Sequence, residues 1–161
     1  MKKTFLALAA TLALASAADA AIVTYDFSVT IDTAGTPYSG LTYDGSFSYD
    51  DAIPGGTGAG GESLFPVTAF CFVFDRSYAL PDLAFGDAAF DGTRFVGLDA
   101  GGARFSFVPE VGGAAPFFAF DFGGGVAGNG SFTAARAVPE PLTAALAALA
   151  LAGMVGLRRR R

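Results

Sequence analysis

Three aspartates lie close together in the sequence, and carboxylates are the ligands that calcium prefers. Asp50 and Asp51 precede the glycine-rich run of residues 53–63, and Asp44 lies six residues before Asp50. A calcium ion takes about six to eight oxygen ligands. The chain has neither an Asp-x-Asp-x-Asp-Gly loop nor a Gly-Gly-x-Gly-x-Asp repeat. These aspartates are therefore weak calcium candidates, and capping of a turn is the favoured interpretation.

Tyrosine rings could support a different chemistry, the stacking of sugars. Such rings on an exposed strand face would make the chain a carbohydrate-binding module. A secreted weak glycan hydrolase belongs to the same alternative class of function. Tyrosines in alternating segments more often belong to a core, which is the favoured interpretation. The four candidates are Tyr38, Tyr43, Tyr49 and Tyr78.

No residue pattern in the chain indicates an enzyme. Histidine is absent from the sequence, which removes Ser-His-Asp triads, histidine-dependent zinc sites and the usual general base near neutral pH. The spacing of the acidic residues selects no pair for glycoside hydrolysis. There is no Gly-x-Ser-x-Gly elbow, and the glycine-rich run lacks the ending of a phosphate-binding loop. We expect no catalytic residue and no cofactor.

The single cysteine, Cys71, lies in the run Ala-Phe-Cys-Phe-Val-Phe-Asp. One cysteine cannot form an internal disulfide. A reactive thiol or an intermolecular bridge is one interpretation. The favoured interpretation is a small apolar side chain buried among phenylalanines.

The candidate aspartates, tyrosines and cysteine are expected to lie on or beside β-strands. Apolar and polar residues alternate through the middle of the chain, which is the pattern of strands. Residues 23–32 and residues 41–50 alternate with a period of two, which is typical of half-buried strands. The turn-forming residues between them predict an antiparallel pair. Residues 67–75 are apolar on both sides and predict a central strand that is covered on both faces.

Later segments add further strands. Asp91-Gly92 predicts a hairpin turn, and a second turn is expected around Gly101-Gly102. About seven or eight strands at spacings of about ten residues predict an all-β domain over residues 21–137, either an antiparallel sandwich or a small barrel. Sixteen of the seventeen phenylalanines fall in this domain and supply its core.

The predicted domain is strongly acidic. Residues 21–138 carry four basic side chains against thirteen acidic ones, a formal charge of −9. This charge repels nucleic acid and anionic membrane surfaces. We therefore expect no nucleic-acid partner. The four basic residues are Arg76, Arg94, Arg104 and Arg136.

Residues 1–20 are typical of a secretory signal peptide. Lys2 and Lys3 precede a short apolar run, and the segment ends in Ala18-Asp19-Ala20. The alternative is a membrane-spanning helix, but the run is too short to cross about 30 Å of hydrocarbon. We expect signal peptidase to cut before Ala21.

The end of the chain has three parts with different physical roles. Two prolines exclude a regular strand or helix interior. Residues 142–157 are without charge, and as a transmembrane helix they would span about 24 Å. The terminal arginines would hold their end on the cytoplasmic side of the membrane. The proline-containing part is Val138, Pro139, Glu140 and Pro141, and the terminal arginines are Arg158, Arg159, Arg160 and Arg161.

Residues 138–161 resemble the PEP-CTERM sorting signal of exported bacterial proteins in the order and spacing of these parts. The resemblance implies a precursor held transiently in the inner membrane and cut near Pro-Glu-Pro by an exosortase. It further implies a structural protein of the cell surface or extracellular matrix, with exopolysaccharide of the biofilm as a partner. An ordinary single-pass anchor is the alternative for the tail. The chain has no Leu-Pro-x-Thr-Gly motif before the apolar run, which argues against processing by a sortase.

Overall fold

The structure is a computed structural model and describes residues 22–137. The predicted signal peptide and its cleavage site, the motif at residues 138–141, the apolar segment 142–157 and the arginine cluster 158–161 lie outside the described residues. Within residues 22–137, no helix is both long enough and apolar enough to cross a membrane.

The described chain is all β, as the alternation of its residues predicts. One 3-10 turn, η1 (Leu80–Asp82), interrupts the strands. The strands are β1 (Ile22–Ile31), β2 (Thr42–Asp50), β3 (Gly56–Thr57), β4 (Ser63–Val73), β5 (Ser77–Ala79), β6 (Leu83–Asp91), β7 (Arg94–Gly102), β8 (Phe105–Val108), β9 (Phe117–Asp121) and β10 (Ala127–Arg136).

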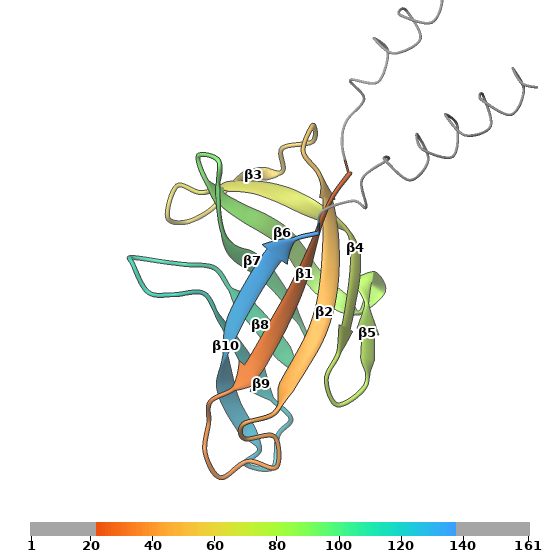
Figure 1. The fold of residues 1–161 in the computed structure, drawn as a ribbon, viewed down its shortest axis with the longest axis vertical. Helices are drawn as coiled ribbons and strands as arrows, with labels where there is room; N and C mark the ends of the chain where they lie inside the picture. The colour runs from red at the N-terminus through yellow and green to blue at the C-terminus, as the bar shows by residue number, and fades with distance from the viewer. Residues whose placement is uncertain (1–21, 138–161) are drawn as a thin grey trace, which may run out of the picture.

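Eight of these strands form a closed antiparallel barrel (Figure 1). The order around the wall is β2-β1-β10-β9-β8-β7-β6-β4, and β4 pairs back with β2 over Gly45↔Phe72 to Tyr49↔Val67. The short strands β3 and β5 are added to β4 outside this circuit. Of the two architectures left open by the sequence, the structure is therefore the barrel.

The predicted pair of β1 and β2 is confirmed, with Tyr25 opposite Phe47 and Val29 opposite Tyr43. Alternation carries the apolar side chains of β1 inward, where Val29 is fully buried. The polar side chains of both strands face outward. One alternating pattern therefore produces both the barrel wall and part of its core.

Phenylalanine rings fill the interior of the barrel. Phe72 has no exposed surface and contacts six other phenylalanine rings, including Phe27 and Phe118. Most of these contacts are edge-on or tilted, an arrangement that adds about 0.5–1.5 kcal/mol per pair beyond the burial of area. The barrel therefore encloses packed side chains. Its buried phenylalanines are Phe27, Phe47, Phe70, Phe72, Phe74, Phe90, Phe105, Phe107, Phe118, Phe120 and Phe132.

Strand β4 differs from its prediction as a strand covered on both faces. Phe70 and Phe72 point inward and are buried, whereas Val73 is 51% exposed and Cys71 is exposed. The predicted burial of Cys71 is therefore wrong. The cause is the architecture, since a barrel wall has a packed core on its inner side and no second layer over this part of its outer side.

The two predicted turns have different outcomes. Asp91-Gly92 forms the β6–β7 hairpin, with Asp91 opposite Arg94 and a φ of 61° at Gly92. Gly101 and Gly102 lie instead within β7, and the turn follows them. A Cβ at Gly101 would stand 2.9 Å from the ring of Phe85. Glycine is needed at this position because the Phe85 ring packs closely against the strand. In the sequence alone, a Gly-Gly pair in a strand looks the same as one in a turn.

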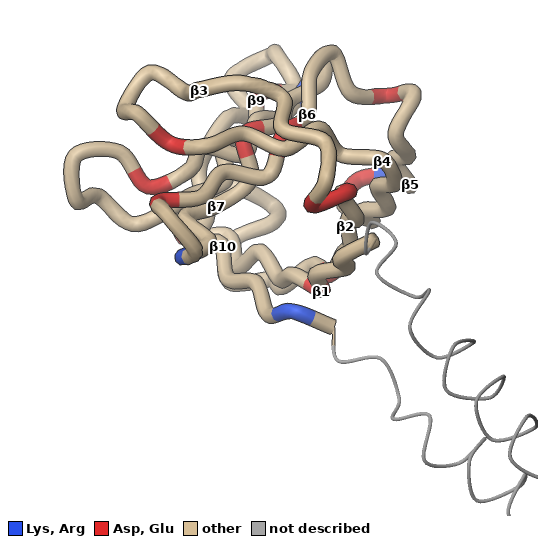
Figure 2. Tube along the Cα trace, turned by 90° about the horizontal axis from the view of Figure 1, so that it is seen from above, with Lys and Arg blue, Asp and Glu red and all other residues tan. Residues whose placement is uncertain are grey.

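The two ends of the described chain lie at the same end of the barrel (Figure 1). Tyr25 is opposite Arg136, and the Ala137 amide donates a hydrogen bond of 2.8 Å to the Thr24 carbonyl oxygen. The opposite end is closed by Tyr38, whose ring contacts Phe74, among others. Acidic residues are distributed along the chain around the barrel (Figure 2).

Candidate functional site

The weak calcium candidates do not form one cluster. Asp44 and Asp50 lie six residues apart on the outer face of β2, a separation of about 20 Å along an extended strand. Asp44 accepts a hydrogen bond of 2.6 Å from the Ser28 hydroxyl, and Asp50 accepts one of 2.9 Å from the Ala52 amide. Asp51 follows in the turn. Residues 22–137 contain no group of three or more His, Cys, Asp or Glu placed to hold a metal ion.

The four candidate tyrosines pack into the barrel. Tyr49 and Tyr78 are 6% and 4% exposed, and the rings of Tyr38 and Tyr43 pack against the core. The Tyr78 hydroxyl donates a hydrogen bond of 2.6 Å to Asp75. Burial, and then this hydrogen bond, raise the pKa of Tyr78. The rings of Tyr49 and Tyr78 are therefore not available to stack on a sugar at the surface.

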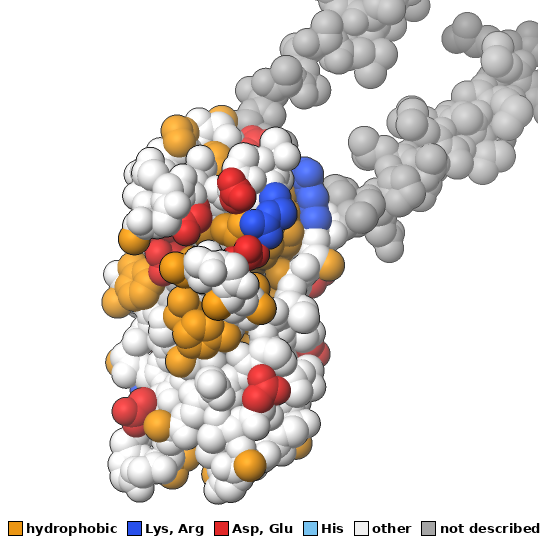
Figure 3. Space-filling view, turned by 90° about the vertical axis from the view of Figure 1, so that its left-hand side faces the viewer, with side chains coloured by type: hydrophobic (Ala, Val, Ile, Leu, Met, Phe, Trp, Pro, Cys, Tyr) orange, Lys and Arg blue, Asp and Glu red, His pale blue; other side chains and the backbone are white. Residues whose placement is uncertain are grey.

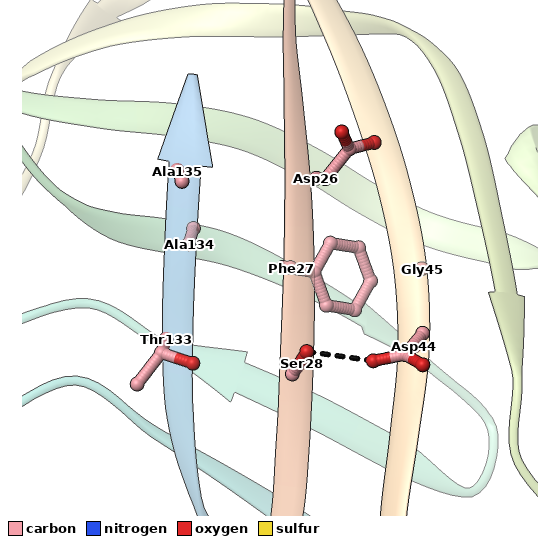
Figure 4. Close-up of a pocket in the computed structure, with 8 residues that line it drawn as sticks. All are labelled: Asp26, Phe27, Ser28, Asp44, Gly45, Thr133, Ala134 and Ala135. Carbon is pink, nitrogen blue, oxygen red and sulfur yellow. Dashed lines mark hydrogen bonds between the residues drawn. The ribbon is translucent and has the colours of Figure 1, made fainter. Parts of the chain in front are cut away.

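A groove of about 410 Å³ lies on the outer face of β10, β1 and β2 (Figure 4). The glycine and alanines that line it make it hollow, and carboxylates and hydroxyls supply its polar groups. It could hydrogen-bond a neutral polyol, but it offers no exposed aromatic ring, since Phe27 is 3% exposed. The lining residues are Asp26, Phe27, Ser28, Asp44, Gly45, Thr133, Ala134 and Ala135.

Polar side chains beside this groove satisfy one another across β1 and β2. The hydroxyls of Thr24 and Ser48 are 2.8 Å apart, and those of Thr30 and Thr42 are 3.0 Å apart. Cross-strand pairs of this kind stabilise a sheet by about 0.2–1 kcal/mol each. The outer face of these two strands is therefore a largely self-paired polar surface.

A pair of carboxylates that the sequence did not indicate lies on the opposite wall. Asp87 of β6 and Asp99 of β7 are directly opposite each other in the antiparallel register. Both are partly buried. Burial raises the pKa of each carboxyl, and the negative charges of Asp87 and Glu62 raise that of Asp99 further. Like charges in such a position destabilise a sheet.

The glycine-rich connection between β2 and β4 packs beside this pair. The Gly55 amide donates a hydrogen bond of 2.7 Å to the Leu64 carbonyl oxygen. A Cβ at Gly55 would stand 2.8 Å from Pro66 and 3.3 Å from a carboxylate oxygen of Asp87. The backbone at Gly55 therefore lies against the carboxylate of Asp87.

The tip of the same connection lines a polar hollow of about 220 Å³. Arg94 donates to Glu110 at 2.7 Å and lies 3.5 Å from Asp91. The Arg94 guanidinium lowers the pKa of Glu110. Glu62 faces the hollow from the glycine-rich connection. The face drawn in Figure 3 mixes acidic and basic side chains with hydrophobic ones.

No family model, curated protein or solved structure matches this chain. Its function is therefore argued from its own residues. Those predicted to direct export and processing lie outside the described residues: Ala18, Ala20, Ala21, Val138, Pro139, Glu140, Pro141, Arg158, Arg159, Arg160 and Arg161.

Proposed function

We propose that the protein is a non-catalytic structural component of the bacterial cell surface or exopolysaccharide matrix. Signal peptidase removes residues 1–20, the tail holds the precursor in the inner membrane, and an exosortase cuts near residues 138–141. The observation that carries the proposal is the order of the tail, in which Pro139-Glu140-Pro141, an uncharged run and four arginines follow one another.

The position of the last described residue supports a tether that is cut next to the folded domain. Ala137 is held to Thr24 at one end of the barrel, and the motif begins at the next residue, Val138. Because Ile22 lies at the same end of the barrel (Figure 1), the opposite end, closed by Tyr38, is free to face away from the membrane. Cleavage at the motif would then leave the barrel whole.

The surface of the barrel supports a structural role over a secreted carbohydrate-binding module or glycan hydrolase. Tyr49 and Tyr78 are buried, and the groove on β10, β1 and β2 has no exposed ring. Asp87 and Asp99 project side by side from neighbouring strands, whereas glycoside hydrolysis needs two carboxyl groups that flank one bond.

The test is the intact mass of the exported protein in a host that has an exosortase. Wild type is expected to lose its tail. Glu140→Ala/Pro141→Ala is expected to be exported with the tail intact. Asp26→Ala/Pro37→Ala is the matched control, because it also removes one acid and one proline from exposed positions, and it is expected to be trimmed like wild type.

Two results contradict the proposal at different points. A Glu140→Ala/Pro141→Ala variant that is trimmed as completely as wild type shows that Pro-Glu-Pro is not the recognition element. If the wild-type protein keeps its tail in a host whose exosortase trims the host's own substrates, then the tail is an ordinary single-pass membrane anchor.

A further inference from the structure

We propose that residues 53–62, which we call the glycine flap, hold tightly to the barrel wall at acidic pH and loosen as Asp87 and Asp99 ionise. This inference is independent of the proposed function, since it concerns only described residues. Asp87 and Asp99 would then set the pH at which the glycine flap opens.

The first observation is the position of the two carboxylates. Asp87 and Asp99 are cross-strand neighbours, and directly opposite side chains have Cβ atoms about 4.5–5.5 Å apart. Within residues 22–137, neither side chain has a hydrogen bond or an ion pair. Protonation of one member removes the repulsion between them and lets it donate to the other.

The second observation is that the flap lies beside one member of the pair. The backbone at Gly55 lies against Pro66 and the Asp87 carboxylate. No amide of the flap donates a hydrogen bond to Asp87 within the described chain. An ionised Asp87 therefore needs water that the closed flap restricts, whereas a protonated Asp87 does not.

The flap itself is weakly attached. β3 contributes two residues to the sheet, paired as Gly56↔Leu64 and Thr57↔Ser63. The tip is held by the Gly58 amide, which donates 2.8 Å to the Glu62 carbonyl, and by the Gly60 amide, which donates 3.0 Å to the Glu62 carboxylate. Its five glycines cost more entropy to order than other residues. Segments of this kind open at low free energy.

The charged groups around the pair come from each neighbouring element. Asp91 follows on β6, Arg94 precedes on β7, and Glu110 lies before β9. Arg94 is engaged with Asp91 and Glu110. From the flap, Glu62 adds a further negative charge near Asp99. The paired segment of β4, residues 63–66, contributes no titratable side chain.

The direction of the response follows from linkage. If closing the flap favours protonation of Asp87, then ionisation of Asp87 must favour opening by the same free energy. The flap therefore closes as pH falls from neutral to about 4. A pKa that is one pH unit higher with the flap closed corresponds to about a tenfold change in its opening equilibrium.

Nuclear magnetic resonance of the barrel within the full chain tests this inference. The carboxyl carbons of Asp87 and Asp99 are followed between about pH 3.5 and pH 8, together with the amides of Gly55 and Gly58. We expect these amides to shift with the same midpoint as the aspartate pair. Their amide exchange, corrected for the intrinsic effect of pH, is expected to slow at least threefold, or about 0.65 kcal/mol, from pH 7.5 to pH 4.

Asp99→Asn removes one charge and keeps the shape of the side chain. It is expected to lower the titration midpoint of Asp87 and to flatten the response of the flap. Asp26→Asn is the matched control, since Asp26 is exposed and opposite the neutral Ser46 and Ala135. Flap amides that do not change while Asp87 and Asp99 titrate overturn the inference. So does a response that persists unchanged in Asp87→Asn, because the flap lies beside Asp87 and the linkage argument depends on the ionisation of this residue.

Discussion

The ring of Phe27 occupies the space that a side chain at position 45 would fill. Phe27 and Gly45 are directly opposite each other on β1 and β2 (Figure 4). A Cβ at Gly45 would overlap the Phe27 ring and would stand 2.6 Å from the Cys71 carbonyl oxygen. The absence of a side chain at Gly45 thus leaves room in the barrel for the large Phe27 ring. The ring in turn packs over the glycine of the neighbouring strand.

Gly45→Ala is expected to destabilise the barrel by about 1–3 kcal/mol, because the added methyl group meets a backbone atom that cannot move alone. Unfolding in urea measures the loss. Gly86→Ala is the matched control, since its methyl group would meet the flexible end of Leu83 at 3.0 Å. Equal losses in the two variants would contradict this account of Gly45.

Phe72→Ala is expected to cost about 3–5 kcal/mol, because the variant leaves a cavity among the rings that fill the barrel. Phe117→Ala provides the comparison, since Phe117 is 40% exposed, and it is expected to cost less than about 1 kcal/mol. Urea midpoints measure both. If Phe72→Ala does not fold, Phe72→Leu gives the same ranking with a smaller loss. A barrel that tolerates Phe72→Leu as well as Phe117→Ala would not have a packed interior.

Asp99→Asn is expected to stabilise the protein at pH 7 and to have a much smaller effect near pH 4. Burial first, and then the charges of Asp87 and Glu62, raise the pKa of Asp99 in the folded chain. A carboxyl with a raised folded pKa penalises folding above that pKa, and the penalty disappears as pH falls toward the unfolded value of about 3.9.

The stabilisation at pH 7 is expected to be about 0.2–1 kcal/mol, the usual range for a cross-strand pair. Urea unfolding of wild type and variant at pH 7 and pH 4 measures it. Glu110, whose pKa is lowered by Arg94, acts in the opposite direction in both proteins and cancels in the comparison. A difference that is the same at both pH values would exclude ionisation of the pair as its cause.

Cys71 is expected to react with a maleimide in the folded protein at a rate close to that in urea, because its side chain points outward from β4. Cys71→Ser is expected to change the unfolding free energy by less than about 0.5 kcal/mol. A Cys71→Ser/Ala88→Cys variant gives the buried comparison, since Ala88 has no exposed surface. Its labelling is expected to be on the order of a thousandfold slower. Protection of Cys71 comparable to that of position 88 would restore the buried interpretation.

Local alternation was enough to predict much of this fold. In β1 and β2 the polar and apolar residues alternate cleanly, so the pair, its inner face and its polar outer face followed from sequence. In β4 the outward residues Ala69, Cys71 and Val73 are small or apolar although they are exposed. Composition alone therefore suggested a covering layer that the barrel does not have at this place.

Contacts between distant segments could not be predicted in this way. Closure depends on the pairing of β4 with β2 across the β3 connection, and alternation is the same in a sandwich and in a barrel. The acidic pair depends on a bulge. Ala89 is opposite Gly97, but Phe90 is opposite Phe95, so Val96 is the extra residue that brings Asp87 opposite Asp99. A regular hairpin would have placed Asp87 opposite Leu98.

The closure of the wall by β2 and β4 has a consequence for the behaviour of this protein at high concentration. Strand edges are where chains nucleate fibres, and in the described part of this chain only the short strands β3 and β5 stand outside the closed circuit. Copies crowded together would remain discrete particles instead of joining backbone to backbone. Any cohesion between neighbours would have to come from side chains or from material held between them.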